Sequence, residues 1–446
     1  MTKDLTRGTP WKLILQFALP IMAGNLLQQL YNTADTINLG NFEGQQALSS
    51  VGACASLTIL FTALALGFSI GAGVLISQYF GAGRTEELRR YAATAIVLML
   101  AMGLVMSVIG LLSAELLLRS FLGTPETLLP QAVLYFRIYA AGLVFQFGYN
   151  IAAALLRALG DSRATLYFLL VSSVLNVVLD LLFVAVCGMG VAGAAIATVI
   201  SQLASCVIGF RYMHRRYELL RFSAHELRLE AAAAGRILRV GLPMALQQSI
   251  VSCGFLFLQK LVNFYGESMI ASYTVASRME NILMIPIIGI QSTMATYAGQ
   301  NMGAKLPDRV SRGLGQGVLV SLFMTLALCA CQIAGISLII GAFRLDEAAA
   351  EICRQHLFAS AVAIPIFAVY FPANGMFQGV GEGFHATFYA LMALGLRVVF
   401  AYSLHKTALF GYTAIWWSQA MAWTLTLIVC YAHFFRGKWK ETSLIA

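Results

Sequence analysis

Long apolar stretches alternate with short polar clusters along the whole chain, and each stretch is long enough to cross a membrane as a helix. The stretches contain about 20 or more residues, which is the length a helix needs to span a hydrocarbon core about 30 Å thick. In the first half they cover residues 12–38, 48–78, 91–113, 130–156, 164–187 and 190–213. In the second half they cover residues 237–264, 270–299, 311–341, 354–378, 385–409 and 411–435. The pattern predicts an all-α membrane protein with twelve transmembrane helices.

The composition agrees with this pattern and excludes most soluble functions. Of 446 residues, 59% are hydrophobic and 11% are charged, whereas a soluble domain carries about 25% charged residues. The eight cysteines lie in or beside apolar runs without a CxxC pair, and the six histidines form no HExxH motif. We therefore expect neither an enzyme nor a bound cofactor, because no hydrolytic triad or phosphate-binding loop is present either.

The basic residues predict the orientation of the helices. Most of the 29 Lys and Arg residues fall on one side if the N-terminus is placed in the cytoplasm, which is the bias that the positive-inside rule describes. Both termini are then cytoplasmic. The polar segment 215–236 is expected to be a cytoplasmic linker between an N-terminal lobe, residues 1–214 with helices 1–6, and a C-terminal lobe, residues 237–446 with helices 7–12.

The chain also contains an internal repeat at an offset of about 222 residues. This offset aligns LP at 19–20 with LP at 242–243, and QYFGAG at 78–83 with QNMGAK at 300–305. Because each half has an even number of helices, the halves are parallel repeats, an arrangement that suits alternating access by two lobes. A channel is less favoured, since no segment resembles a selectivity filter.

Two carboxylates lie within predicted spans of the first half, where an ionisable side chain costs at least about 2.5–3.5 kcal/mol on insertion scales. They are Asp35 in helix 1 and Asp180 in helix 5. Tyr31 and Asn176 each lie four residues before one of them and therefore share its helix face. The predicted polar chamber consists of Tyr31, Asp35, Asn150, Asn176, Asp180 and Thr198.

The second half does not repeat these carboxylates, which favours a functional role over a purely structural one. Under the repeat offset, Asp35 aligns near Phe257 or Leu258, and Asp180 aligns with Ala401. Burial and a neighbouring like charge would raise the pKa of one carboxylate, so H⁺ is one predicted coupling ion. The oxygens of Asp35, Asn176, Asp180 and Thr198 could also bind Na⁺, and the sequence does not distinguish the two ions.

The second half carries other polar and adaptable residues that are candidates for a substrate cleft. Arg397 and Glu280 are expected to form an interhelical ion pair rather than to bind substrate, and methionine and tyrosine in such spans more often serve packing. The candidate cleft residues are Gln247, Gln248, Arg278, Glu280, Met284, Tyr370 and Arg397.

Several motifs together resemble the multidrug and toxic compound extrusion (MATE) family, specifically its DinF-like or MepA-like bacterial branch. The motifs are LYNTADT at 30–36, ISQYFGAG at 76–83, ALLRALGDSRAT at 154–165, NVVLD at 176–180 and GVAGAAIAT at 190–198. The resemblance implies two pseudo-symmetric six-helix lobes around a central cleft in the bacterial cytoplasmic membrane. It implies a monomer that exports cationic or amphipathic small molecules in exchange for H⁺ or Na⁺.

The family's cation site in the first lobe corresponds to the same six residues as the predicted polar chamber. A second-lobe carboxylate site, as in NorM-type members, is not expected, because residues 237–264 and 354–378 contain no acidic residue. An alternative function is a lipid-linked precursor flippase of the same superfamily, which would need several basic residues in its cleft. The two basic residues considered for the cleft are Arg278 and Arg397. A membrane receptor or assembly factor would have no use for the carboxylate chamber.

Overall fold

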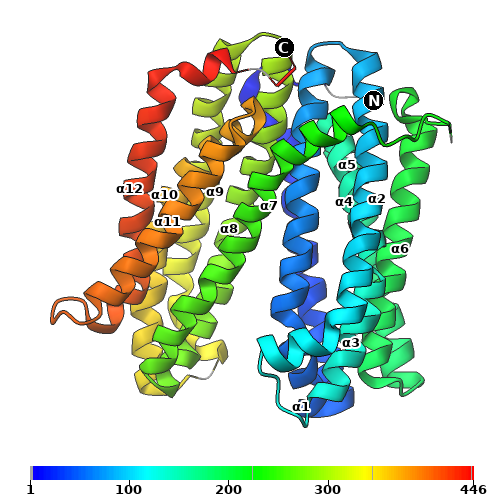
Figure 1. The fold of residues 1–446 in the computed structure, drawn as a ribbon. Helices are drawn as coiled ribbons and strands as arrows, with labels where there is room; N and C mark the ends of the chain where they lie inside the picture. The colour runs from blue at the N-terminus through cyan, green and yellow to red at the C-terminus, as the bar shows by residue number, and fades with distance from the viewer. Residues whose placement is uncertain (1–3, 224, 344, 443, 446) are drawn as a thin grey trace. The chain divides into compact units, whose positions relative to one another are not determined.

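The computed structural model describes residues 4–223, 225–343, 345–442 and 444–445, and the side chains of residues 31–45 and 252–256 lie outside that description. The described chain is helical, and no strand occurs in it (Figure 1). Each predicted span lies mostly on helical segments, so the all-α prediction is confirmed. Nine helices among the described residues are long and apolar enough to cross a membrane, or ten if one bent pair counts as a single span.

In the first half, the described residues form six α-helices and three shorter helical turns. They are α1 (Pro10–Gly81), α2 (Thr85–Leu116), η1 (Leu117–Phe121), α3 (Leu129–Ala141), α4 (Leu143–Ala158), α5 (Ser162–Asp180), η2 (Leu181–Val186), α6 (Gly190–Arg216) and η3 (Glu218–Leu220). The first two predicted spans both lie within α1, which passes the length and apolarity criteria on either side of residues 31–45.

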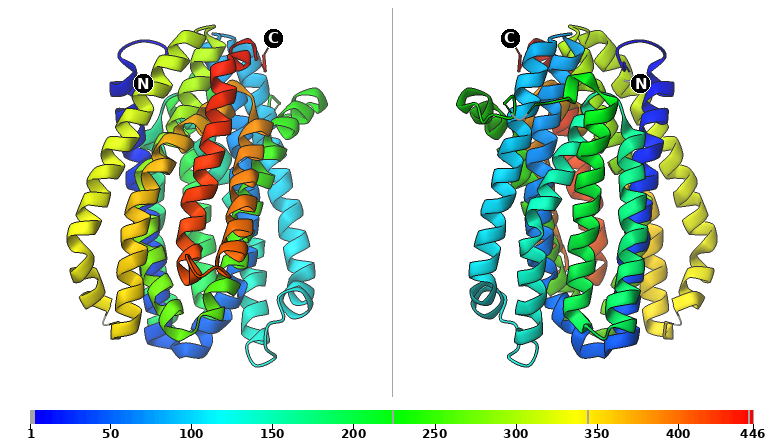
Figure 2. Two further views of the ribbon diagram at one scale, coloured as in Figure 1. Left: turned by 90° about the vertical axis from the view of Figure 1, so that its left-hand side faces the viewer. Right: turned by 90° about the vertical axis from the view of Figure 1, so that its right-hand side faces the viewer.

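The described residues of the second half also form six α-helices, with one short 3₁₀ turn before α12 and another after it. They are α7 (Ala231–Phe264), α8 (Glu267–Gly303), α9 (Pro307–Phe343), α10 (Glu347–Val380), α11 (Gly383–Leu404), η4 (Gly411–Thr413), α12 (Ala414–Arg436) and η5 (Lys438–Glu441). The helices α11 and α12 pack side by side, as Figure 2 shows in orange and red.

The span predicted at 130–156 is not a single straight helix. It is divided into α3 and α4, which are bent by 45° at Gly142. A Cβ atom at Gly142 would lie 2.5 Å from Cγ2 of Val199 in α6, so only glycine allows this close approach. Kinks of this size usually occur where a glycine or proline interrupts the helix.

The described residues form two compact units. Unit 1 includes Ala23–Ser249, and unit 2 consists of Asp4–Met22 and Ile250–Ala446. The first part of α1 therefore packs within unit 2, whereas the first part of α7 packs within unit 1. The first helix of each half thus begins in the unit formed by the other half. The two exchanged segments occupy corresponding positions in the internal repeat.

Glycines form the contact in both units. In unit 1, a Cβ atom at Gly67 of α1 would lie 2.8 Å from the carbonyl carbon of Met244 and nearer still to the backbone of the next residue in α7. In unit 2, a Cβ atom at Gly289 of α8 would lie 2.6 Å from Cγ of Met22 in α1. Both glycines and both methionines are related by the offset of about 222 residues, so the packing confirms the internal repeat.

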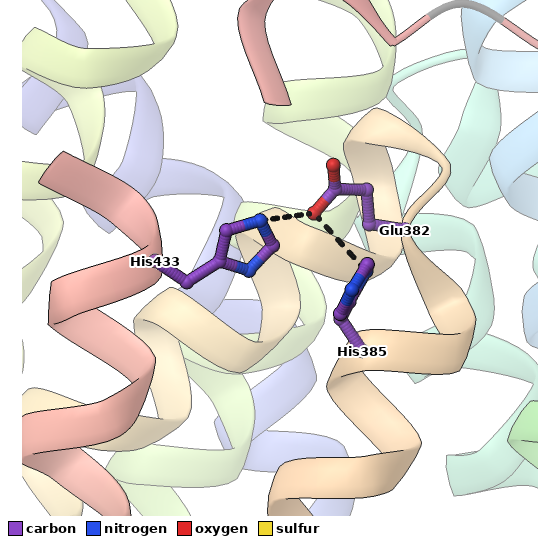
Figure 3. A group of neighbouring side chains, drawn as sticks. All are labelled: Glu382, His385 and His433. Carbon is purple, nitrogen blue, oxygen red and sulfur yellow. Dashed lines mark ion pairs between the residues drawn. The ribbon is translucent and has the colours of Figure 1, made fainter. Parts of the chain in front are cut away.

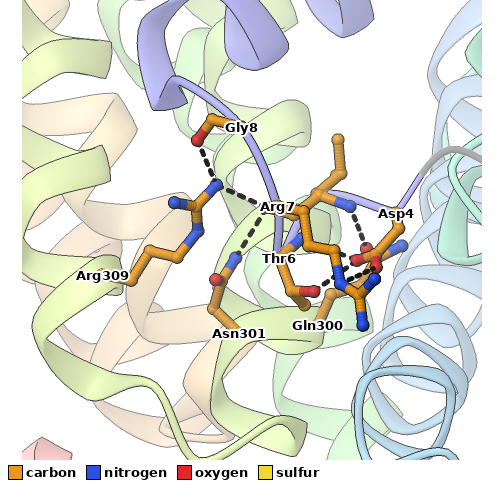
Figure 4. Close-up of polar contacts among 8 residues, drawn as sticks. Asp4, Thr6, Arg7, Gly8, Gln300, Asn301 and Arg309 are labelled. Carbon is orange, nitrogen blue, oxygen red and sulfur yellow. Dashed lines mark hydrogen bonds and ion pairs between the residues drawn. The ribbon is translucent and has the colours of Figure 1, made fainter.

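The segment that precedes α1 is held in unit 2 by polar contacts with α8 and α9 (Figure 4). The backbone N–H of Leu5 donates to Oε1 of Gln300 at 2.9 Å, and its carbonyl accepts from Nδ2 of Asn301 at 3.3 Å. Arg309 donates to the carbonyl of Gly8 at 2.7 Å. The Leu5 side chain is fully buried, so this segment is part of the folded unit.

Candidate cation site and polar clusters

Two predicted site residues, Asn176 and Asp180, lie buried on one face of α5. Their exposed fractions are 2% and 1%, and α5 packs against α6 and α4. Neither the amide nitrogen nor the amide oxygen of Asn176 has a hydrogen-bond partner among the described residues. Asp180 is the last residue of α5, and the backbone continues as the π-helical turn η2, a geometry that is frequent at functional sites.

The motif before α5 holds this helix in place. Asp161 caps its N-terminus, because one carboxylate oxygen accepts from the backbone N–H of Ala164 at 3.0 Å. The other oxygen accepts from the hydroxyls of Tyr212 at 3.0 Å and Tyr217 at 2.5 Å. Burial and this hydrogen bond raise the pKa of Tyr217. The ALGDSRAT motif is therefore structural and ties α5 to the end of α6.

Asn150 belongs to a buried polar network that links α1, α3 and α4. Its amide donates to the carbonyl of Gln146 at 2.8 Å. The Gln146 side chain donates to the hydroxyl of Thr62 at 2.8 Å and accepts from the hydroxyl of Tyr139 at 3.1 Å. Sequence reasoning missed Thr62, Tyr139 and Gln146. The spacing of Gln146 and Asn150, four residues apart on one helix, was the available signal.

The other predicted members of the chamber are placed less completely. Thr198 is half-buried on α6, and its hydroxyl donates to the carbonyl of Ala194 at 3.0 Å. The side chains of Tyr31 and Asp35 lie outside the described residues. The joint cation site of these residues therefore stays a prediction.

A second buried cluster lies in unit 2 and contains a residue that the sequence left unassigned. His356 of α10 is 2% exposed, and its Nε2 lies 3.2 Å from Oε1 of Glu280 in α8. The imidazole stacks between Tyr273 at 5.6 Å and Trp416 at 4.8 Å, measured between ring centroids. Arg397 of α11 is buried and interacts electrostatically with the same carboxylate.

The other candidate cleft residues differ in their burial. Arg278 is exposed on α8 and Met284 is half-buried, whereas Tyr370 is buried in the core of unit 2. The hydroxyl of Tyr370 accepts from Nδ2 of Asn374 at 3.0 Å, which favours a packing role. Gln247 is buried and Gln248 half-buried on the part of α7 that belongs to unit 1.

The chain is similar to multidrug export proteins over nearly its whole length. The MatE family model matches residues 20–182 and again residues 243–403. "Probable multidrug resistance protein YpnP" of Bacillus subtilis is 29% identical, with 99% of this chain and 98% of that protein covered. "Multidrug export protein MepA" of Staphylococcus aureus is 24% identical, with 93% and 91% covered.

The fold comparison agrees with the sequence comparison. A solved structure described as the outward-facing conformation of a multidrug resistance MATE family transporter of the MOP superfamily matches with a TM-score of 0.89. It is 25% identical, and 99% of each chain is covered. Its likeness confirms the predicted twelve-helix fold. The chain therefore belongs to the multidrug and toxic compound extrusion (MATE) family of multi-pass membrane transporters.

Proposed function

We propose that this transporter exports cationic or amphipathic small molecules in exchange for inward H⁺ or Na⁺ by alternating access. Family membership and the multidrug export relatives support the export of small molecules. The coupling ion is proposed to bind at the buried face of α5, with Asp35 as the second carboxylate.

The observation that carries this proposal is the unpaired amide of Asn176 one turn from the buried Asp180. Buried polar side chains nearly always have hydrogen-bond partners, so an amide without one among the described residues needs a reason. A carboxylate within the membrane is costly unless its charge is neutralised. A proton on Asp180 removes that charge, and Na⁺ coordinated by the carboxylate and the amide oxygen of Asn176 compensates it while giving the amide a partner.

The coupling follows from the charge of this site. When the site holds no cation, its negative charge favours a cationic substrate and opposes burial of α5 against its neighbours. An ion that enters from outside neutralises the site and lets the helices repack. Because an ion can shift a two-state equilibrium only through a difference in its affinity for the two states, the site must bind H⁺ or Na⁺ more tightly in the conformation that releases substrate.

The experiment is transport of a cationic dye into proteoliposomes under separately imposed pH and Na⁺ gradients. The wild type should respond to one gradient, and Asp180→Asn should abolish that response while the protein remains folded. Asp308→Asn is the matched control, because this carboxylate is highly exposed on α9. If neither gradient drives transport, antiport is excluded, and if Asp180→Asn keeps the wild-type response, the site is wrong.

The alternative substrate, a lipid-linked precursor with a pyrophosphate, is less favoured. Of the two arginines that are candidates for the cleft, Arg278 is exposed and Arg397 belongs to the cluster with Glu280 and His356. Arg397 therefore already has a carboxylate partner, and Arg278 alone would not make a basic pocket. Movement of a fluorescent lipid pyrophosphate from one leaflet to the other in vesicles that contain the protein would favour the flippase function instead.

The proposed location is the bacterial cytoplasmic membrane, with both termini in the cytoplasm and the protein as a monomer. The distribution of Lys and Arg supports this orientation. Alkaline phosphatase fused after the C-terminus should be inactive, because that enzyme folds only outside the cytoplasm, where disulfides form. An active fusion would reverse the proposed orientation.

A further inference from the structure

Three side chains of metal-ligand type meet in unit 2, where α10 ends and α11 begins, away from the polar clusters described above. They are Glu382, His385 and His433 (Figure 3). Oε2 of Glu382 lies 3.6 Å from Nδ1 of His385 and 3.4 Å from Nε2 of His433. One ligand atom from each residue lies within 4.8 Å of the other two.

The backbone explains why these residues meet. Gly381 has a φ of 103° and ends α10 in the left-handed conformation, which glycine adopts at little cost. The chain thereby reverses, so that Glu382 immediately precedes α11 and His385 follows within its first turn. His433 comes from the last turn of α12, which packs against α11.

The two more buried residues, Glu382 and His433, each make a hydrogen bond through the atom that faces away from the cluster, as ligands in metal sites commonly do. Nδ1 of His433 lies 2.6 Å from the hydroxyl of Tyr389, and its ring stacks on Phe377 with centroids 5.0 Å apart. If Nδ1 donates this hydrogen bond, the lone pair on Nε2 faces Glu382. Oε1 of Glu382 accepts from the hydroxyl of Thr442 at 3.1 Å.

The other carboxylate oxygen of Glu382, Oε2, faces the two histidines and accepts no hydrogen bond from the described residues. The Glu382 side chain is 10% exposed, and its Oε2 has no hydrogen-bond partner among the described residues. Two imidazole nitrogens form ion pairs with it at 3.4 and 3.6 Å, without the geometry of a hydrogen bond. A buried carboxylate oxygen with this environment has the geometry of a ligand.

We propose that Glu382, His385 and His433 bind a divalent transition-metal cation, with Zn²⁺ as the representative ion. Zn²⁺ takes His nitrogen and carboxylate oxygen at about 2.0–2.2 Å, which places two tetrahedral ligands about 3.3 Å apart. The observed separations of 3.4 and 3.6 Å match this spacing. Mg²⁺ and Ca²⁺ prefer oxygen ligands, so two imidazoles disfavour them.

A metal ion bound at this site should exchange with metal ions in solution. Three protein ligands leave one coordination position open, and His385 is 49% exposed, so the ion can enter from the aqueous side. Arg436 and Lys438 are near enough to act electrostatically on His433, and their positive charges lower the affinity for a cation. A bound ion would fasten the turn between α10 and α11 to the end of α12 and, through Thr442, to the C-terminal segment.

The test is Zn²⁺ binding by the full-length protein, purified with a tag that contains no histidine. Calorimetric titration should show one Zn²⁺ per chain, and Zn²⁺ but not Mg²⁺ should raise the melting temperature. His385→Ala and His433→Ala should each weaken binding at least about tenfold. His214→Ala is the matched control, because this exposed histidine lies outside the cluster.

Two further measurements keep the outcome decisive. Tyr389→Phe retains the ring packing but removes the hydroxyl that contacts Nδ1 of His433, so it should weaken Zn²⁺ binding and lower the melting temperature of the Zn²⁺-bound protein more than that of the metal-free protein. Co²⁺ bound in place of Zn²⁺ should give a tetrahedral spectrum without the thiolate charge-transfer band that cysteine ligands would produce. The absence of binding, binding unchanged in the two histidine variants, or a thiolate band would overturn the proposal.

Discussion

Two glycines of α10 bring this helix against the backbone of α8. Gly375 and Gly379 lie one turn apart on the face that packs against α8. A Cβ atom at Gly375 would lie 2.9 Å from the carbonyl carbon of Gln291 and nearer still to its oxygen. One at Gly379 would lie 2.9 Å from Cβ of Ala298. Ordinary contacts begin at 3.4 Å, so Gly375→Ala must push the helices apart.

The magnitude follows from what the separation disrupts. Backbone atoms cannot rotate away as a side chain can, so overpacking here costs about 1–3 kcal/mol. The hydrogen bond from Nε2 of Gln291 to Oδ1 of Asn374, 2.9 Å long, crosses the same contact, and its weakening costs about 0.5–1.5 kcal/mol. The gain from alanine over glycine in a helix offsets about 0.5–1 kcal/mol. A net loss of about 2 kcal/mol lowers Tm by roughly 4–8 °C.

The assay is thermal unfolding of the purified protein, followed by intrinsic tryptophan fluorescence. Gly395→Ala is the matched control, since a Cβ atom at this glycine of α11 meets nothing within 4 Å. Its Tm should stay the same or rise slightly. If Gly375→Ala unfolds at the same temperature as Gly395→Ala, the close contact between α8 and α10 does not contribute as described.

Three further predictions concern other contacts. Gly67→Ala should destabilise unit 1 by about 1–3 kcal/mol, because the start of α7 must move to make room for the added methyl group. Gly52→Ala is the control and should not change the stability, because a Cβ atom at Gly52 meets nothing within 4 Å. Equal melting temperatures of the two variants would contradict the exchanged packing. Arg309→Ala removes a charged hydrogen-bond donor worth about 1.5–3 kcal/mol, so amide hydrogen exchange in residues 5–13 should accelerate at least about tenfold. An unchanged exchange rate would show that other contacts hold this segment. Backbone and side-chain hydrogen bonds from Ser223, together with Arg89, lower the pKa of Glu226 to about 2. The contact of the segment before α7 with Arg89 is therefore complete above pH 4.5 and is lost as the pH falls toward 2. Proteolysis of that segment should become faster over the same pH range, and a Glu226→Gln variant should lose this pH dependence.

The helices could be predicted because lipid imposes one simple demand on the sequence. Every span needs about 20 apolar residues, and this length is visible without knowledge of contacts. The bend at Gly142 was not predicted, and the close contact that requires glycine there comes from Val199 of α6, a residue far away in the sequence. The apolar pattern is continuous across the bend and gives no sign of it.

Polar residues that share a helix face can be grouped from the sequence alone. Asn176 and Asp180 are four residues apart, so their common face followed from helical geometry. Glu280 and His356 are brought together by the packing of α8 against α10, and nothing in either local sequence indicates the partner. The cluster of Glu382, His385 and His433 was missed for the same reason.

The exchange of the first helical segments has a consequence for how the two repeats depend on each other. A half produced alone would lack the helix start that fills its own unit and would expose the glycine face at Gly67 or Gly289 to lipid or detergent. The halves should consequently accumulate only when they are synthesised together, even as separate polypeptides.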